Sequence, residues 1–213
     1  YAIQLCDVVE TGGPEIGDVS SEVTEILLEL EYMFRDNFGD ELRRILRANW
    51  SYIHEHETIF DQIHDPSQVR GEQNVLRYVP FETVLVRVDE NDSLFEIITR
   101  VLAVQLSGAS LILSWMPKAF TADIQMARGV IDKFLNDKAV QFDHSNEELL
   151  VQLESVDRMR FARPNRVPES LRVKAAALNT YIADAPVLME GRLELLQYYS
   201  EQTISNRYHR YGN

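Results

Sequence analysis

Cysteine is almost absent from this sequence, in which Cys6 is the single thiol. One cysteine excludes an internal disulfide bond and any metal site built from several thiolates, and it suits a reducing compartment. We therefore expect a cytoplasmic protein. No basic residue adjoins Cys6 in the sequence to activate it as a nucleophile, so we interpret it as a bystander thiol.

Long hydrophobic runs are also missing. The longest apolar stretches, such as VLAVQL and ASLILSWM, are far shorter than the roughly 20 residues that a membrane-spanning helix requires. The N-terminus has no basic segment followed by an apolar one. We therefore expect neither a membrane span nor a secretion signal. A hydrophobic fraction of 45% and a charged fraction of 26% instead indicate an ordinary globular chain.

Positive charge is scarce, because 21 Lys and Arg stand against 34 Asp and Glu, a formal net charge of −13. Affinity for nucleic acid comes chiefly from basic side chains that neutralise phosphates, so we expect no nucleic-acid partner. Four arginines are nevertheless concentrated in RMRFARPNR: Arg158, Arg160, Arg163 and Arg166. We favour an interdomain salt-bridge surface for this run, with solvated charge and a small-anion site as alternatives.

Glycine is missing where a nucleotide-binding fold needs it. The one cluster, Gly12, Gly13 and Gly17, has Pro14 where a dinucleotide-binding fingerprint requires its second glycine. We interpret residues 1–20 as a linker that follows a candidate strand, YAIQL.

Two amphipathic helices are predicted next. Apolar residues recur at intervals of three and four from residue 21 to residue 38, where Gly39 ends the pattern. Asp40 is suited to capping a second helix, whose apolar stripe consists of Leu42, Ile45, Leu46, Trp50, Ile53 and Phe60. The pattern predicts a helical hairpin over residues 21–70, which the Pro66 and Gly71 region ends.

The remaining residues, 71–213, alternate between short β-rich runs and helical segments. The predicted strands are VLRYV, TVLVRV, SLILSW, AVQF and RMRF, and helices are predicted over about 93–107, 120–135 and 145–154. This alternation predicts an α/β fold with a Rossmann-like, mostly parallel sheet. Beyond Pro168 we expect a helix in ESLRVKAAALN, a strand pair around TYIADAPVLM and a final helix in GRLELLQYYSEQTIS.

An acidic loop follows the strand TVLVRV, where such folds usually hold a phosphate. Asp89, Glu90 and Asp92 occupy it, and Ser93 with Glu96 forms a capping-box pattern that starts a helix. A carboxylate about 5 Å from a phosphate costs on the order of 3 kcal/mol at an effective dielectric constant of about 20. We therefore expect this loop to start the helix and to repel pyrophosphate.

Other catalytic and metal-binding patterns fail on spacing. His54 and His56 in HEHETIFDQIH point to different faces of a helix, and neither has a histidine four residues later, so we interpret them and His64 as solvated. The serines at positions 107, 110 and 114 lie in no nucleophile elbow. The sequence thus predicts no catalytic residue and no metal site.

The C-terminal tail, SNRYHRYGN, is rich in side chains that anchor protein interfaces. We expect it to dock on the same chain or on a neighbouring copy. The candidate docking residues of the whole sequence are Arg77, Tyr78, Arg158, Arg160, Arg163, Tyr208, His209, Arg210 and Tyr211.

Two stretches resemble a known family. DPSQVRGEQNVLRYVPFETVLVRV and the closing YSEQTISNRYHRYGN resemble the C-terminal region of long bacterial proline-catabolising enzymes. These are proline utilization A and the related bifunctional proline dehydrogenase/1-pyrroline-5-carboxylate (glutamate-semialdehyde) dehydrogenase. The resemblance extends from about residue 50 to the end. The opening YAIQL resembles the place where the catalytic aldehyde dehydrogenase unit finishes.

The resemblance implies a supporting role. Members of the family oxidise proline with FAD, pass the intermediate through a tunnel and oxidise glutamate semialdehyde with NAD. Their C-terminal region is similar in fold to the nucleotide-binding domain of aldehyde dehydrogenases, but it is non-catalytic, supports the dehydrogenase unit and covers the tunnel. By this resemblance the partner of our chain is the upstream catalytic module, and NAD and FAD belong to the parent and not to this fragment.

The sequence departs from the pattern of active members in several places. Their Pro-Trp-Asn loop is replaced by residues 89–92, and their Lys-Pro pair is reversed as Pro117-Lys118. Only RFARP stands in place of their Phe-Thr-Gly-Ser stretch, and no Gly-Gln-x-Cys segment carries a nucleophile. No catalytic or cofactor-binding residue can therefore be assigned. The alternatives are an active NAD-dependent dehydrogenase domain with an atypical cofactor site and an acidic adaptor unrelated to aldehyde oxidation.

Overall fold

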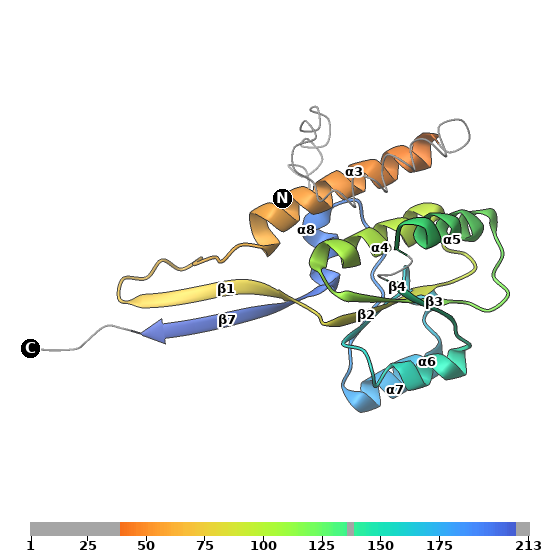
Figure 1. Cartoon of the computed structure of the whole chain (residues 1–213). Helices are drawn as coiled ribbons and strands as arrows, with labels where there is room; N and C mark the ends of the chain where they lie inside the picture. Colours follow the sequence, from red (N-terminus) through yellow and green to blue (C-terminus); the bar gives the residue numbers. More distant parts are fainter. Residues whose placement is uncertain (1–38, 136–138, 208–213) are drawn as a thin grey trace, which may run out of the picture.

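The computed structural model describes residues 39–135 and 139–207 (Figure 1). In chain order its elements are α3 (Gly39–Glu55), the π-helix η1 (His56–Phe60), β1 (Glu72–Pro80), β2 (Thr83–Val88), α4 (Leu94–Ser107), β3 (Ser110–Trp115), α5 (Ala122–Leu135), β4 (Ala139–Asp143), α6 (Asn146–Gln152), β5 (Arg158–Arg160), the 3-10 helix η2 (Pro164–Arg166), α7 (Glu169–Leu178), β6 (Ile182–Ala183), α8 (Gly191–Glu194), the 3-10 helix η3 (Leu195–Gln197) and β7 (Tyr199–Arg207).

Several predictions from the sequence lie outside these residues. They are the linker over 1–20, the helix over 21–38 and the tail residues Tyr208, His209, Arg210 and Tyr211. Of the predicted helical hairpin, only the second helix, α3, is described.

The main sheet has five parallel strands in the order β4-β3-β2-β5-β6. Four of them, β2 to β5, match predicted strands, so the predicted α/β fold with a mostly parallel sheet is confirmed. The chain runs from β2 outward to β4, then crosses back to the other side of β2 at β5. This reversal creates a switch point between the carboxyl ends of β2 and β5, which is the usual ligand position in such sheets.

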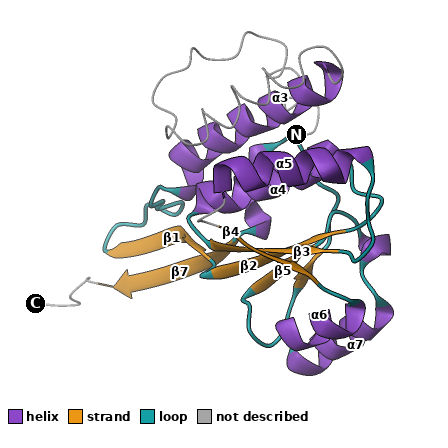
Figure 2. Cartoon of the chain, turned by 45° about the vertical axis from the view of Figure 1, so that its right-hand side comes forward, coloured by secondary structure: helices purple, strands orange, loops and turns teal. Residues whose placement is uncertain are grey.

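Helices cover both faces of the sheet (Figure 2). Helices α4 and α5 lie on one face and α3 packs outside α4, whereas α6 and α7 lie on the opposite face. Alternate residues of β2 enter the two cores: Val84 and Val86 join the cluster beneath α4, and Leu85 joins the cluster over α6 and α7. Because α3, α5 and the sheet surround α4, that helix is buried on nearly every side.

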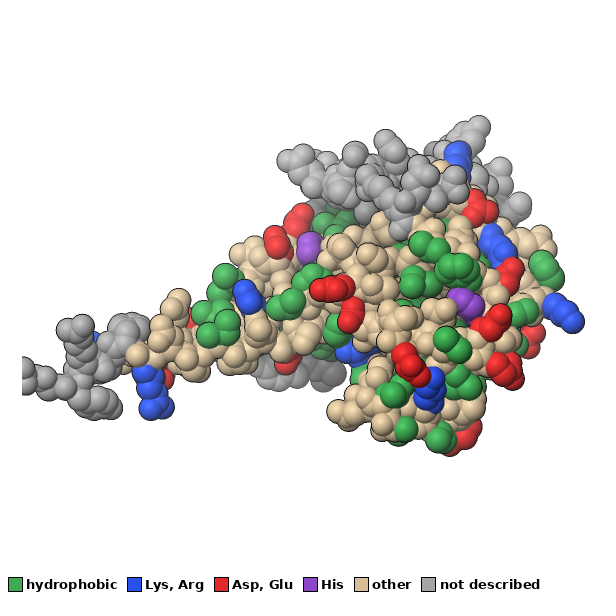
Figure 3. All heavy atoms as spheres, turned by 60° about the horizontal axis from the view of Figure 1, so that its bottom comes forward, with side chains coloured by type: hydrophobic (Ala, Val, Ile, Leu, Met, Phe, Trp, Pro, Cys, Tyr) green, Lys and Arg blue, Asp and Glu red, His purple; other side chains and the backbone are tan. Residues whose placement is uncertain are grey.

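A separate two-stranded antiparallel ribbon, β1 with β7, forms an arm that projects from the body (Figures 1 and 3). Its register runs from Glu72 opposite Arg207 to Pro80 opposite Tyr199. VLRYV is therefore a strand, as predicted, but it belongs to the arm and not to the parallel sheet. Beyond its root, no helix of the described residues covers the arm, and its side chains are therefore mostly exposed or half-buried.

Two local predictions at the end of the chain were wrong. The final helix predicted over residues 191–205 stops after α8 and η3, and residues 199–207 form the strand β7. The strand pair predicted around TYIADAPVLM is one short strand, β6, which pairs in parallel with β5. In both cases pairing with a strand that is distant in sequence decides the conformation, which local periodicity does not report.

Aromatic packing fixes the root of the arm to η1. The ring of Phe60 lies 4.6 Å from that of Tyr78 and 4.9 Å from that of Tyr199, between ring centroids. His56 Nδ1 lies 3.0 Å from the Tyr199 hydroxyl oxygen. His64 pairs with Leu76 of β1 through two backbone hydrogen bonds. The arm is therefore anchored at its root, and the pairing of His64 extends the contact to the middle of β1.

Among the helices that the structure describes, none combines the length and the apolar character needed to cross a membrane.

Candidate functional site

The N-terminus of α4 lies at the carboxyl end of β2, beside the switch point, where nucleotide-binding folds hold a phosphate on unpaired backbone N–H groups. Ser93 caps the helix, and the predicted capping box with Glu96 is confirmed. The Ser93 N–H donates to Glu96 Oε2 at 3.1 Å, and the Glu96 N–H donates to Ser93 Oγ at 3.2 Å. Two of the backbone donors that a phosphate would use are thus already bonded.

Carboxylates from two other helices take the donors that remain. The Leu94 N–H donates to Asp123 Oδ2 of α5 at 3.1 Å, and the Phe95 N–H donates to Glu41 Oε1 of α3 at 3.1 Å. Every N–H from Ser93 to Glu96 therefore has an acceptor within the protein, and three of the four acceptors are carboxylates. A phosphate in this position would have to displace acidic side chains and would be repelled by them. The residues present do not fit the pyrophosphate of a dinucleotide.

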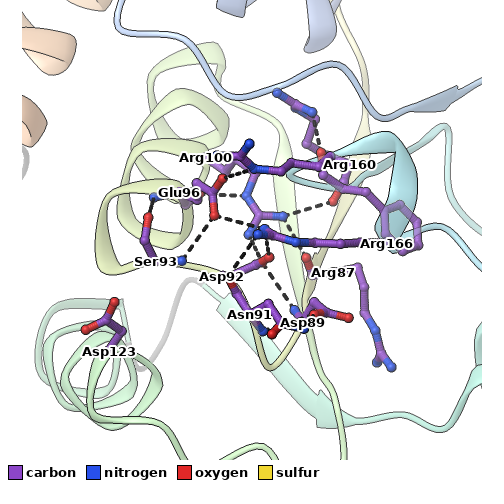
Figure 4. A network of polar contacts seen from close by, with 12 residues as sticks. Arg87, Asp89, Asn91, Asp92, Ser93, Glu96, Arg100, Asp123, Arg160 and Arg166 are labelled. Atoms are coloured by element: carbon purple, nitrogen blue, oxygen red, sulfur yellow. Dashed lines mark hydrogen bonds and ion pairs between the residues drawn. The ribbon is translucent and has the colours of Figure 1, made fainter.

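A buried ionic network ties the loop after β2 to the loop after β5 (Figure 4). Asp92 is 3% exposed and pairs with both Arg100 and Arg166. Arg166 Nη1 also lies 2.9 Å from Glu96 Oε2, and Arg163 Nε lies 2.7 Å from Glu96 Oε1. The network spans the switch point, because Asp92 and Glu96 follow β2 and the last two arginines follow β5.

This network shows that the three carboxylates of the acidic loop are not equivalent. Asp92 is buried and neutralised by arginine, so only Asp89 and Glu90 of the three remain accessible. Burial by itself raises the pKa of Glu96, but the bonds from Arg166, the Ser93 N–H and Arg163 outweigh it and hold that pKa below its usual value. Glu96 is therefore a structural anion.

The arginine run over residues 158–166 serves mainly the interior of the chain. Arg160 has no exposed surface and its Nη2 lies 2.8 Å from Glu194 Oε1, so it is an internal residue and cannot dock on another module. Arg158 stacks on two aromatic rings, 4.3 Å from the centroid of Phe81 and 4.6 Å from that of Tyr181. The side chain of Arg163 is 54% exposed. Of the three candidate docking residues in this run, Arg158, Arg160 and Arg163, it is therefore the most accessible to a partner.

Two further candidate docking residues lie on the arm. Arg77 is exposed and its Nε donates to Gln202 Oε1 of β7 at 2.6 Å. Tyr78 is half-buried against Phe60 at the root of the arm. The arm therefore brings Arg77 and Tyr78 together with β7, the strand that leads to the tail.

The histidines do not converge. His54 is exposed, His56 contacts Tyr199, and His64 lies 2.8 Å from the carbonyl oxygen of Ile59 through Nε2. The interpretation of all three as solvated was therefore wrong for His56 and His64, which are half-buried at the root of the arm. Within residues 39–135 and 139–207, no group of three or more His, Cys, Asp or Glu side chains could hold a metal ion.

Comparison with known proteins gives structural matches only. No family model matches the chain, and no curated protein matches it in sequence. Among solved structures, proline utilization A (PutA) from Corynebacterium freiburgense is 25% identical over 94% of this chain, with a TM-score of 0.55. PutA from Bradyrhizobium japonicum is 16% identical over 75% of this chain, with a TM-score of 0.54. A Bacillus subtilis protein classed with the aldehyde dehydrogenases is 13% identical over 86%, with a TM-score of 0.53.

The matched regions are small parts of long proteins. This chain spans 16% of the Corynebacterium PutA, 17% of the Bradyrhizobium PutA and 47% of the Bacillus protein. The comparisons therefore show an α/β fold like that of aldehyde dehydrogenases and a structural similarity to part of PutA.

Proposed function

We propose that this chain is a non-catalytic module of a larger proline-catabolising dehydrogenase of the PutA kind. In this proposal it supports the 1-pyrroline-5-carboxylate dehydrogenase unit of the same protein and covers the tunnel through which the intermediate passes. NAD and FAD belong to the parent protein, and this module binds neither.

The observation that carries the proposal is the filled N-terminus of α4. The fold provides a parallel sheet, a switch point and a helix directed at the phosphate position, but Glu41, Glu96 and Asp123 have taken the N–H groups. These contacts favour a scaffold over a cofactor site, since three carboxylates in that position oppose a dianionic pyrophosphate. A dehydrogenase module without a cofactor site contributes surface and not chemistry.

The similarity to PutA supports the proposed context. The match covers 94% of this chain and only 16% of the Corynebacterium PutA, which is what a module of a larger protein would give. Packing is the proposed mechanism. A rigid sheet and the segment after β7 would cover part of the neighbouring active unit, exclude water and limit the escape of a reactive aldehyde.

Titration of the isolated 213-residue chain with NAD tests the proposal. Circular dichroism and thermal unfolding first establish that the isolated chain is folded. We expect no saturable heat in calorimetry up to millimolar NAD. Saturable binding in the micromolar range would contradict the proposal and would favour the alternative, an active NAD-dependent dehydrogenase domain with an atypical cofactor site.

A further inference from the structure

A polar pocket of about 540 Å³ opens at the switch point, on the side of the sheet that α6 and α7 cover. Its volume lies within the range of small-molecule sites. The loops after β2, β4 and β5 supply its walls, and the residues that line it are Asp89, Asn91, Asn146, Asn165, Arg166, Val167 and Pro168. The pocket does not use the blocked N-terminus of α4, so a ligand of another class could enter it.

A buried cation stands behind this pocket. Arg87, on β2, is 3% exposed, and its Nη1 donates to Ser114 Oγ at 3.0 Å, to the Trp115 carbonyl at 3.1 Å and to the His144 carbonyl at 2.7 Å. Its Nη2 makes one long contact, 3.4 Å, to Oδ1 of Asn146, which lines the pocket. Figure 4 shows Arg87 directed away from the ionic network of Asp92.

Arg87 differs from the other buried arginines in making no close ion pair with a described carboxylate, although Asp89 and Asp92 favour its charged form from a longer distance. Arg100 pairs with Asp92 and Arg160 pairs with Glu194, whereas no carboxylate of the described residues lies within ion-pair distance of the Arg87 guanidinium. Burying a charge without an opposite charge is costly, and carbonyl dipoles offset only part of that cost. An anionic group bound at the Asn146 side of the pocket would supply an opposite charge at close range.

The lining of the pocket also includes a carboxylate with spare capacity. Asp89 Oδ1 accepts from the backbone N–H and the side-chain amide of Asn91, at 3.0 Å and 2.9 Å. Asp89 Oδ2 has no hydrogen-bond partner among residues 39–135 and 139–207, and neither does the side chain of Asn165. The charge of Arg166 is already balanced by Asp92 and Glu96. The pocket therefore has a cation without a close ion pair behind it, and one available carboxylate and several amides in its lining.

We propose that this pocket binds a small zwitterion of the amino-acid class. The ligand carboxylate lies at Asn146 in front of Arg87, the ligand ammonium group bonds to Asp89 Oδ2, and the Asn165 amide bonds to either end. A phosphate ester has no group for Asp89 and is repelled by it, and a divalent cation finds one available carboxylate instead of several. The inference is independent of the proposed scaffold role and adds a metabolite-sensing site to it.

Calorimetry on the protein at its natural length, with L-alanine as the probe, tests this inference. Acetate and ethylamine each carry one of the two charges of the probe, and AMP represents a nucleotide. We expect L-alanine to bind in the millimolar range or tighter, and both half-ligands and AMP to bind at least tenfold more weakly. Acetate leaves Asp89 without a partner and ethylamine leaves Arg87 without one, which is the physical reason why each should bind more weakly than L-alanine.

Variants test whether the measured heat of L-alanine binding comes from this pocket. Asp89→Asn and Asn165→Ala lie at accessible positions and should each weaken L-alanine binding at least fivefold, whereas the matched controls Asp61→Asn and Asn206→Ala should leave it unchanged. Arg87→Gln should abolish binding, but its burial puts folding at risk, so the two accessible variants decide the matter. The inference is overturned if acetate binds as tightly as L-alanine, if AMP binds better, or if Asp89→Asn binds L-alanine as well as the native protein does.

Discussion

Buried charge in this protein is organised by arginines that reach across the chain. Glu194 Oε1 accepts from Arg160 Nη2 at 2.8 Å and from the Tyr198 hydroxyl at 2.9 Å, and its Oε2 accepts from the Leu188 N–H at 3.0 Å. Burial raises the pKa of Tyr198 well above its usual value, and the Glu194 carboxylate raises it further, so the phenol remains a donor. The pair is satisfied on all sides, which is the condition under which a buried ion pair is tolerated.

Glu96 provides a prediction about stability and pH. Its pKa is lower in the folded protein than in the unfolded chain, so its contribution is present above the unfolded value, near 4.5, and is lost as the pH falls through the folded value. We expect Glu96→Gln to lower the free energy of unfolding at pH 7 by about 2 kcal/mol, the usual scale for hydrogen bonds to a charged group. Below pH 4.5 the difference from the native protein should shrink.

Urea unfolding between pH 3 and pH 8 measures this effect. Glu90→Gln is the matched control, because Glu90 is an exposed carboxylate of the same loop with no described partner, and it should change neither the stability nor its pH dependence. A constant difference between Glu96→Gln and native protein down to pH 3 would contradict the role given to Arg166 and Arg163.

The sequence predicted only the short-range part of the site at this scale. The bond between Ser93 and Glu96 spans three residues and has a recognisable spacing. Glu41 and Asp123 reach the same helix end from 54 and 29 residues away, and no local pattern indicates them. The role of Arg87 could not be predicted for a similar reason. The sequence shows a basic residue in a β-branched strand, but it does not show whether an acidic residue from elsewhere in the chain will pair with it.

At the scale of elements, strands buried on both faces were the easiest to predict. TVLVRV and SLILSW are continuous runs rich in apolar residues with short turns around them, and they became β2 and β3 with the predicted bounds. Strand β7 was missed because YYSEQTISNR has little apolar alternation, and most of its side chains are exposed. Its backbone pairing with β1, and not burial, makes it a strand.

The anchoring of the arm leads to a prediction about its local stability. Phe60 is 3% exposed and contacts Tyr78 and Tyr199, one on each strand of the arm, so Phe60→Ala removes the packing that holds both strands to the body. The expected loss is about 3 to 5 kcal/mol for a buried phenylalanine. In hydrogen exchange measured by mass spectrometry, amides of β1 and β7 should lose more protection than those of β2.

Phe120→Ala is the matched control for this experiment, because Phe120 is 71% exposed and its loss should leave exchange unchanged. Equal loss of protection in the arm and in the parallel sheet would show that the two unfold as one unit, and the arm would then have no separate anchor at Phe60.

At the scale of the whole molecule, the body and the arm differ in how much surface they leave available for contact with another unit. The body is closed around its own core and its switch-point network, whereas nearly all of β7 is exposed and the side chains of β1 are exposed or half-buried. The arm also carries the chain from η3 to Arg207, next to the tail that the sequence marks as an interface. If the chain acts by covering a neighbouring unit, it can make that contact through the arm and the tail without any change in the packing of the body.

If the chain belongs to a PutA-like parent protein, as proposed, deletion of residues 205–213 in that parent tests the arrangement. The deletion removes the last pairs of the arm, from Ser205 opposite Asn74 to Arg207 opposite Glu72, together with the aromatic and basic tail. We expect semialdehyde oxidation and coupled flux from proline to fall while proline oxidation stays nearly intact, because a cover lost from the tunnel lets the intermediate escape. A shorter deletion, of residues 208–213, keeps every pair of the arm and separates the tail from the strand. Unchanged coupled flux after the longer deletion would count against docking by this end of the chain.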